Sequence, residues 1–411
     1  MSRARLPAFD VIVVGAGVIG AAMASLLLAR KLSTAGRVAV VADQFAAAPM
    51  SPDWDLRVFA LSRASERLLK VCGIWNSLPA SRVFPYERMC VFDAGGTPTG
   101  PGSLNFDCAE LGEPNLGYIV DGKELQWHCL QSARAAGVVL IEGTVAAILA
   151  EDDAVMLSLS DGRELRATLL AAADGTDSKS RELLGIDTAG HAYHQDALVA
   201  HVQTAVGHAN TAWQRFLNTG PVAFLPLNDG RCSLVWSVAR HQAEVLRAMT
   251  GAAFGDALTE ASGGVLGRCT LTSKLASFPL KLQYAVDYAR PRAVLLGDAA
   301  HVVHPLAGQG LNLGLLDCAA LAQVLGDAGG AENFGDYQHL RRYERWRRSE
   351  NVIAAAALDG LERLFSNSDA RSVALRTAGL SAVARMPFVK HGFARRALGL
   401  AGDVPEFLKA V

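Results

Sequence analysis

The chain lacks an excess of charge of either sign. Its 411 residues include 39 Lys and Arg against 40 Asp and Glu, which gives a formal net charge of −1. That balance argues against a general nucleic-acid binder, because such proteins normally carry a basic excess or a basic stripe. Charged residues make up only 19% of the chain and hydrophobic residues 51%. This composition excludes disorder as a description of the whole chain and predicts two or more packed units.

Cysteine is scarce and unevenly spaced. There are seven cysteines, an odd number, and no Cys-x-x-Cys pair. The spacing therefore indicates neither a disulfide framework nor a zinc site, and we expect no metal. Dispersed single cysteines are typical of small buried side chains in a reducing compartment. The residues concerned are Cys72, Cys90, Cys108, Cys129, Cys232, Cys269 and Cys318.

Long hydrophobic runs are also rare, and only residues 11–29 continue for 19 residues without a charge. That length just reaches what a membrane span needs, and Arg3 and Arg5 in front of it resemble the start of a signal peptide. The first half of the run is rich in Val, glycines follow, and the second half is rich in Ala and Leu. A buried strand, a glycine turn and a helix explain this change of character better than a membrane span does. We therefore expect a cytoplasmic protein.

This run opens a strand–helix–strand unit with a glycine-rich turn. We predict a strand at 11–14, a helix to about residue 31 and a second strand at 38–41, in a parallel sheet with a right-handed crossover. The turn holds a Gly-x-Gly-x-x-Gly motif, in which the glycines permit the tight turn, the approach of backbone to a pyrophosphate, and close packing of helix on strand. The motif predicts a dinucleotide site. Its glycines are Gly15, Gly17 and Gly20, and Asp43 after the second strand is the expected ribose ligand.

A later strand of small residues, at 169–173, is followed by Asp174 and Gly175. A strand that ends in this way can aim a carboxylate at a nucleotide. On the residues alone, a plain Asp-Gly turn is the more common explanation.

The most specific pattern lies between residues 297 and 317. Gly297 and Asp298 end a buried strand, where open α/β sheets bind their ligands. Gly308 and Gly310 precede a helix, whose free N–H groups stabilise negative charge. Motifs in this order and spacing predict a bound ligand rather than a capped loop.

The remaining pattern predicts short strands with Gly and Pro turns from 83 to 106, and alternating strands with one helix from 197 to 285. We expect no second phosphate-binding loop in that block. Beyond residue 331 the chain is predicted to be mostly helical. Further predicted helices begin near Ser62 and at 122, and predicted strands lie at 138–141, 155–159 and 164–173, with a hairpin turn at Asp161-Gly162.

Several longer segments are similar to those of one enzyme family. They are Gly-Asp-Ala-Ala-His at 297–301, Gly-Gln-Gly-Leu-Asn-Leu-Gly at 308–314, Arg-Val-Phe-Ala-Leu-Ser at 57–62 and Tyr-Glu-Arg-Trp-Arg at 343–347. On these segments the chain resembles the FAD-dependent aromatic hydroxylases of the p-hydroxybenzoate hydroxylase fold, and within them the ubiquinone-biosynthesis hydroxylases. The resemblance covers nearly the whole chain.

We therefore expect an α/β fold: a Rossmann-like FAD-binding domain with a parallel sheet, a substrate domain of α+β character with a mostly antiparallel sheet, and C-terminal helices. The FAD-binding domain is expected to be discontinuous. The expected ranges are 1–80, 115–188 and 286–330 for the FAD-binding domain, 81–114 and 189–285 for the substrate domain, and 331–411 for the C-terminal helical region.

The resemblance also implies which residues bind FAD, and it favours a ligand role for Asp174, toward both FAD and NAD(P)H. The chain departs from the family pattern at Ala42, where a ribose-binding Glu is usual, and at Asp121-Gly122, where Glu-Asn is usual. The cofactor-binding residues that it implies, together with the motifs above, are Gly15, Gly17, Gly20, Asp43, Arg57, Gln126, Asp174, Gly297, Asp298, Gly308, Gly310, Leu311 and Asn312.

The implied activity is a FAD-dependent monooxygenase that uses O2 to hydroxylate the ring of a polyprenyl phenol in ubiquinone biosynthesis, through a flavin 4a-hydroperoxide. The electron donor is NAD(P)H or another donor. His304 and Pro305 are the candidate catalytic residues, and His301 is more readily explained as structural. The open alternatives are a flavin enzyme acting on a small phenol and a non-catalytic flavoprotein subunit. Apolar strand residues predicted to contact the substrate are Phe216, Phe224, Pro226 and Trp236, although aromatic strand residues more often belong simply to the core.

The last basic segment carries Arg385, Lys390, Arg395 and Arg396 without an acid, interleaved with Phe388 and Phe393. This pattern is typical of a contact with anionic lipid, although a solvated helix face explains it slightly more readily. Expected partners are thus the substrate and O2, with other quinone-biosynthesis proteins and peripheral contact with the inner membrane as open alternatives, and no nucleic acid.

Overall fold

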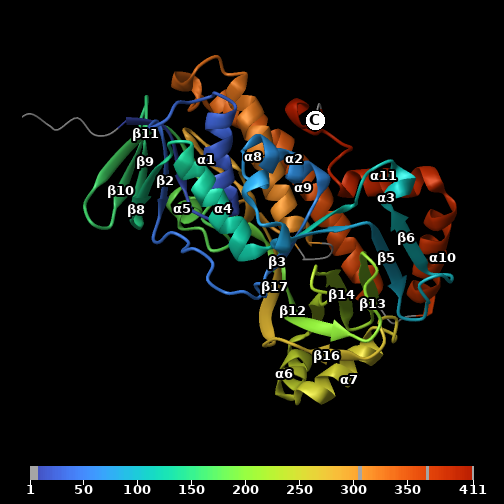
Figure 1. The fold of residues 1–411 in the computed structure, drawn as a ribbon. Helices are drawn as coiled ribbons and strands as arrows, with labels where there is room; N and C mark the ends of the chain where they lie inside the picture. The colour runs from blue at the N-terminus through green and yellow to red at the C-terminus, as the bar shows by residue number, and fades with distance from the viewer. Residues whose placement is uncertain (1–7, 304–307, 367–369, 410–411) are drawn as a thin grey trace, which may run out of the picture.

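The structure is a computed structural model that describes residues 8–303, 308–366 and 370–409. Figure 1 shows two sheets at opposite ends of the molecule, with the long helices α8 (Gln309–Gly326) and α9 (Tyr337–Ser366) between them. Helices α6 (Arg240–Ala248) and α7 (Gly251–Ala261) cover the side of the second sheet that faces away from the first. The expected α/β architecture with C-terminal helices is confirmed.

The first sheet has eight strands, and its central pairs are parallel. All of β1 after its first residue is buried, as expected for a strand with both faces covered. Helix α1 (Val18–Ala29) follows the glycine turn, so the strand–turn–helix interpretation of residues 11–29 is confirmed. The strands are β1 (Ala8–Val14), β2 (Val38–Ala42), β8 (Val139–Glu142), β9 (Val145–Ala150), β10 (Val155–Leu159), β11 (Glu164–Ala172), β18 (Ala289–Arg290) and β19 (Ala293–Leu295).

The second sheet has nine strands and is antiparallel except where β13 pairs with β5. One face of the sheet is covered by α6 and α7, and the other faces α9. The strands are β5 (Arg88–Asp93), β6 (Ser103–Asp107), β12 (Thr188–Thr204), β13 (Thr211–Leu217), β14 (Gly220–Pro226), β15 (Cys232–Ala239), β16 (Cys269–Leu271), β17 (Ala276–Ala285) and β20 (His301–Val302).

A small third sheet joins the two large ones. It consists of β3 (Val58–Leu61), β7 (Gly117–Asp121) and β4 (Val83–Tyr86), in that order. Residues 81–114 therefore do not enter a single sheet, because β4 pairs with β7 whereas β5 and β6 join the second sheet. The domain ranges given above stay a prediction.

The C-terminal helices wrap from the first sheet to the edge of the second, where α10 (Ala370–Arg385) lies along β6 (Figure 1). A buried ion pair fastens this helix, since Arg376 Nε lies 2.9 Å from Asp93 Oδ1 and both side chains are only 2% exposed. In the part of the chain that the structure describes, no helix is long and apolar enough to cross a membrane. The other helices are α2 (Arg63–Val71), α3 (Cys108–Leu111), α4 (Gly122–Ala135), α5 (Lys179–Leu183), α11 (Pro387–Ala397) and α12 (Glu406–Lys409).

Candidate active site

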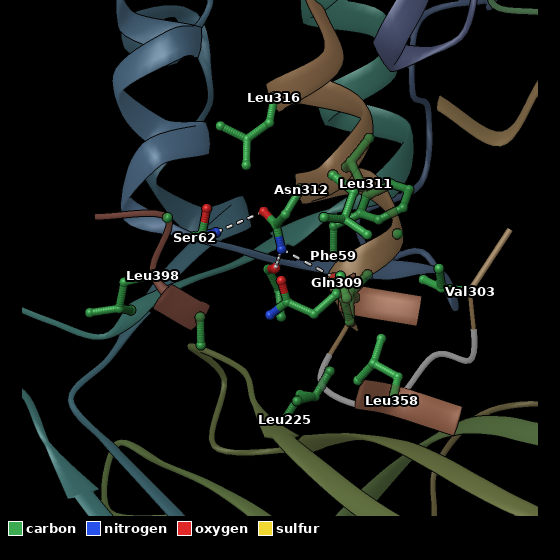
Figure 2. Close-up of a pocket in the computed structure, with 18 of the residues that line it drawn as sticks. Phe59, Ser62, Leu225, Val303, Gln309, Leu311, Asn312, Leu316, Leu358 and Leu398 are labelled. Carbon is green, nitrogen blue, oxygen red and sulfur yellow. Dashed lines mark hydrogen bonds between the residues drawn. The ribbon is translucent and has the colours of Figure 1, made fainter. Parts of the chain in front are cut away.

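A cavity of about 930 Å3 lies where the two large sheets meet. Its walls come from the glycine turn before α1, from β3, β14 and β15, and from helices α8, α9 and α11. Figure 2 shows apolar side chains from several of these elements around the first turn of α8, among them Phe59, Leu225, Leu358 and Leu398. The site is therefore assembled from segments that are far apart in the sequence.

The three glycines of the first turn have different surroundings. A Cβ at Gly15 would lie 2.3 Å from the carbonyl oxygen of Ala173, and one at Gly20 would lie 1.9 Å from the carbonyl oxygen of Gly15. Gly17 lines the cavity and is the N-cap of α1, and no atom lies within 4 Å of the position its Cβ would take. Gly15 and Gly20 thus permit close backbone packing, whereas Gly17 leaves space for a ligand at a helix N-terminus.

The loop that follows β11 and contains Asp174 packs against the glycine turn at Gly15. Ala173 and Gly175 line the cavity, but the Asp174 carboxylate accepts hydrogen bonds from Ser178 Oγ and, at 2.9 Å, from the backbone N of Ser180. Its observed partners therefore belong to its own loop at the start of α5. A direct contact of Asp174 with FAD or NAD(P)H stays a prediction.

Gly297 and Asp298 follow β19 at the carboxyl edge of the first sheet. Gly297 has φ of +57°, and a Cβ there would approach Ile19 Cγ1 to 3.1 Å. Asp298 lines the cavity and accepts a long hydrogen bond of 3.5 Å from Thr176 Oγ1. Its carboxylate retains capacity for a ligand hydroxyl, because a carboxylate can accept several hydrogen bonds.

The first turn of α8 faces the cavity. Gly308 has φ of +62°, and Gly310 and Leu311 line the cavity beside it. No atom lies within 4 Å of a Cβ built at Gly310. The first N–H groups of a helix have no intrahelical partner, so this turn offers main-chain donors and the positive end of the helix dipole.

The side chain of Asn312 holds that turn in place (Figure 2). Its Oδ1 accepts from Ser62 N at 2.9 Å and from Ser65 Oγ at 2.7 Å, and its Nδ2 donates to Ala60 O at 2.8 Å and to Gly308 O at 3.2 Å. These bonds use the four hydrogen-bonding positions of an amide. Asn312 thus joins α8 to β3 and α2, and we assign its side chain to positioning the turn. Sequence reasoning missed this role.

A buried charged network lies behind Gly297. Asp317 is fully buried, and its carboxylate accepts from His301 Nε2 at 2.6 Å, Arg347 Nε at 2.8 Å and the backbone N of Gly297 at 3.1 Å. Burial raises the pKa of Asp317, but the charges and hydrogen bonds of His301 and Arg347 outweigh it and lower the pKa to about 2. Asp317 is therefore a carboxylate at neutral pH. His301 has its observed partner in this network, away from the cavity lining. His304 and Pro305 lie outside the described residues.

Arg57 and Gln126 line the cavity, but Asp43 is exposed beyond β2 and is not part of its lining.

The unusual Asp121-Gly122 pair has a local explanation. The Asp121 carboxylate caps α4 through Lys123 N and accepts from Asp55 N at 2.7 Å. A Cβ at Gly122 would lie 2.4 Å from the carbonyl oxygen of Arg57, so a larger residue would displace the backbone just before β3.

The four residues predicted to contact the substrate do not line this cavity. Phe224 and Trp236 belong to the core on the α6 and α7 side of the second sheet, Pro226 is also buried outside the cavity lining, and Phe216 stacks on Phe365 with ring centroids 3.9 Å apart. Side chains alternate along a strand, so the neighbours of Phe224, Pro226 and Trp236 face the other way, whereas Phe216 is covered by Phe365 of α9. The cavity is lined instead by Pro221, Ala223, Leu225, Val235 and Ser237.

The residues present fit FAD. Gly17 leaves room for a pyrophosphate at the N-terminus of α1, Asp298 offers a carboxylate to hydroxyl groups, and the N-terminus of α8 offers main-chain donors to the same cavity. The N-termini of α1 and α8 both favour negatively charged groups of a ligand.

Comparisons with known proteins agree with this geometry. The family described as FAD binding domain matches residues 8–352. The 3-demethoxyubiquinol 3-hydroxylase of Escherichia coli is 34% identical over an alignment of 397 positions, which covers 95% of this chain and 98% of that protein. The ubiquinone hydroxylase UbiL of Rhodospirillum rubrum is 35% identical over an alignment of 413 positions, which covers 98% of this chain and 93% of that protein.

Among solved structures, p-nitrophenol 4-monooxygenase from Pseudomonas putida superimposes with a TM-score of 0.74 at 20% identity, covering 97% of this chain and all of that one. At that identity the likeness concerns the fold alone. The family match spans most of the chain, and the two relatives align along nearly its whole length. The chain therefore belongs to the FAD-binding monooxygenase family that includes the ubiquinone-biosynthesis hydroxylases.

Proposed function

We propose that this enzyme hydroxylates the aromatic ring of a polyprenyl phenol, an intermediate of ubiquinone biosynthesis. The observation that carries the proposal is the form of the cavity, which extends from the glycine turn and α8 to apolar residues of α9 and α11. A ring can lie beside the first turn of α8 while an apolar tail follows the other wall. The names of the two ubiquinone-pathway relatives support this substrate class.

Bound FAD supplies the redox chemistry that activates O2. The main-chain N–H groups at the start of α8 would favour negative charge on the bound cofactor, and Asn312 keeps that turn in position. Leu225 and Val235 exclude water from the space where the ring would lie. Oriented binding of the ring next to the cofactor is the main contribution that we assign to the protein.

The polar groups beside the proposed ring site are neutral. Gln214 and Ser237 line the cavity from the second sheet, and Tyr86 lines it from β4. Burial raises the pKa of Tyr86 to about 12, so its hydroxyl keeps its proton at neutral pH. Among the residues that the structure describes, no histidine lines the cavity. We propose that hydroxyl and amide groups orient the phenol.

Electrons come from a reduced nicotinamide or from another donor, and we propose that the donor approaches the flank where Arg57 and Lys123 are both exposed and line the cavity. Two basic side chains there suit a phosphate-bearing or acidic donor. We further propose a cytoplasmic location with peripheral membrane contact, and association with other quinone-biosynthesis proteins as a partner class.

The substrate wall can be tested by Ala223→Phe. The added ring would fill the cavity beside β14, so the KM for a short-chain prenyl phenol should rise about tenfold or more while the FAD content stays unchanged. The assay uses purified holoenzyme, NADH or a chemical reductant, and chromatographic detection of the hydroxylated ring.

Ser160→Phe serves as the matched control, because Ser160 is exposed in the hairpin between β10 and β11, remote from the cavity lining. An unchanged KM in Ala223→Phe would contradict the placement of the ring. Equal turnover of prenylated and unprenylated phenols would favour the small-phenol alternative, and a flavin-loaded protein without turnover of either would favour the non-catalytic one.

A further inference from the structure

The cavity opens to the surface between α9 and α11. Ile353 and Leu361 on α9 line the cavity and are 54% and 42% exposed, and Phe393 on α11 lines it and is 58% exposed. Large apolar side chains that both line a cavity and reach the surface mark its mouth. The apolar wall of the cavity is thus continuous with the outer surface on this flank.

Two further large apolar side chains are exposed at the start of α11, in the chain segment before Phe393. Met386 is 52% exposed and Phe388 is 90% exposed, and neither lines the cavity. An almost fully exposed phenylalanine costs free energy in water, and clusters of such residues mark interaction surfaces. We call Ile353, Leu361, Met386, Phe388 and Phe393 the mouth patch.

The charged side chains of α10 and α11 are all basic. Neither α10 nor α11 contains an acidic residue. Lys390 and Arg396 are paired with Glu110 and Glu350, but Arg385 and Arg395 are exposed and have no carboxylate partner among the residues that the structure describes. Phe388 and Arg395 are seven residues apart on α11, so they share one face of the helix.

We propose that the mouth patch inserts into the headgroup region of an anionic bilayer, so that the cavity opens onto lipid. The occupant is a membrane surface because exposed aromatic side chains beside unpaired arginines match its apolar and anionic layers. A prenyl tail then passes from the bilayer along Phe393 and Leu361 into the cavity without crossing water. This inference rests on the proposed function for its substrate, but membrane binding is measured independently of turnover.

The test is flotation of the FAD-loaded enzyme with vesicles of phosphatidylcholine, alone or with 30 mol% phosphatidylglycerol as the chosen composition. The wild-type enzyme should float with the anionic vesicles. The double variant Met386→Ser, Phe388→Ser should bind them about tenfold more weakly, because the inserted apolar surface is lost. Arg395→Glu should weaken binding to anionic vesicles by about fivefold or more and leave binding to neutral vesicles unchanged.

Phe278→Ser is the matched control, because Phe278 on β17 is 52% exposed and lies outside the mouth patch; this variant should float like the wild-type enzyme. All variants should oxidise a water-soluble short-chain phenol at the wild-type rate, whereas the double variant should lose turnover of a vesicle-borne phenol. Unchanged vesicle binding in the double variant would overturn the proposal. A wild-type dimer that the double variant dissociates would also overturn it, in favour of a contact between two copies. Failure to turn over either phenol, with vesicle binding intact, would instead count against the proposed function.

Discussion

Replacing Gly17 with valine is expected to remove bound flavin from a protein that still folds. Gly17 has φ of −73° and ψ of −178°, a conformation that valine adopts readily, and its Cβ would meet no protein atom within 4 Å. The new side chain would instead occupy the space before the N-terminus of α1, where we propose that the pyrophosphate binds. We expect FAD affinity to fall by at least about a hundredfold, since close approach of backbone to phosphate is lost. Flavin absorbance and an FAD titration measure the loss.

Two further glycines make this experiment specific. Gly207 is exposed and also has no protein atom within 4 Å of its Cβ position, so Gly207→Val should keep both fold and flavin. Gly15→Val should unfold the protein, because that Cβ would clash with the backbone of Ala173. A folded Gly17→Val protein with a normal flavin content would refute the placement of the pyrophosphate.

Asp317→Asn is expected to cost about 3 to 5 kcal/mol in the free energy of unfolding, the range for breaking a buried ion pair. The substitution leaves the buried Arg347 and His301 without their carboxylate. Because the folded-state pKa of Asp317 is lowered to about 2, its stabilising contribution is fully present above about pH 4 and is lost as the pH falls toward 2. Urea unfolding of both proteins across this range should show the difference between them shrinking.

Asp327→Asn provides the control for this effect. Asp327 pairs with Arg342 at 2.8 Å on the surface, where both side chains are about half exposed, so the loss should stay within about 1 kcal/mol. A loss in Asp317→Asn that does not change between pH 4 and the lowest pH at which both proteins fold would contradict the assignment of that carboxylate.

The dinucleotide turn could be predicted from the sequence because its chemistry is local. Gly15, Gly17 and Gly20 lie within six residues, and the strand and helix that flank them have clear patterns. The contacts of Asn312 could not be predicted in the same way. Its partner Ser62 lies 250 residues earlier, and nothing in either segment indicates that they meet.

The residues of β14 and β15 that line the cavity were harder to predict, for a different reason. Strands β14 and β15 are covered on both faces, so large apolar residues occur on each side and do not reveal which side lines a cavity. Phe224 and Trp236 are the largest residues there, and they fill the core under α6 and α7, whereas smaller neighbours such as Ala223 leave the cavity open. The apolar residues of α9 that complete the wall lie beyond the 343–347 segment, and no motif marks them in the sequence.

The most direct test of hydroxylation in ubiquinone biosynthesis is mass spectrometry of the quinone intermediates in a strain that lacks this gene. The proposed function predicts that a polyprenyl phenol lacking one ring hydroxyl accumulates, that ubiquinone falls, and that the wild-type gene restores both while Gly17→Val does not. The position of the missing hydroxyl identifies the ring carbon. Unchanged levels of ubiquinone and of every prenylated intermediate, in a strain with no second gene of this family, would contradict it.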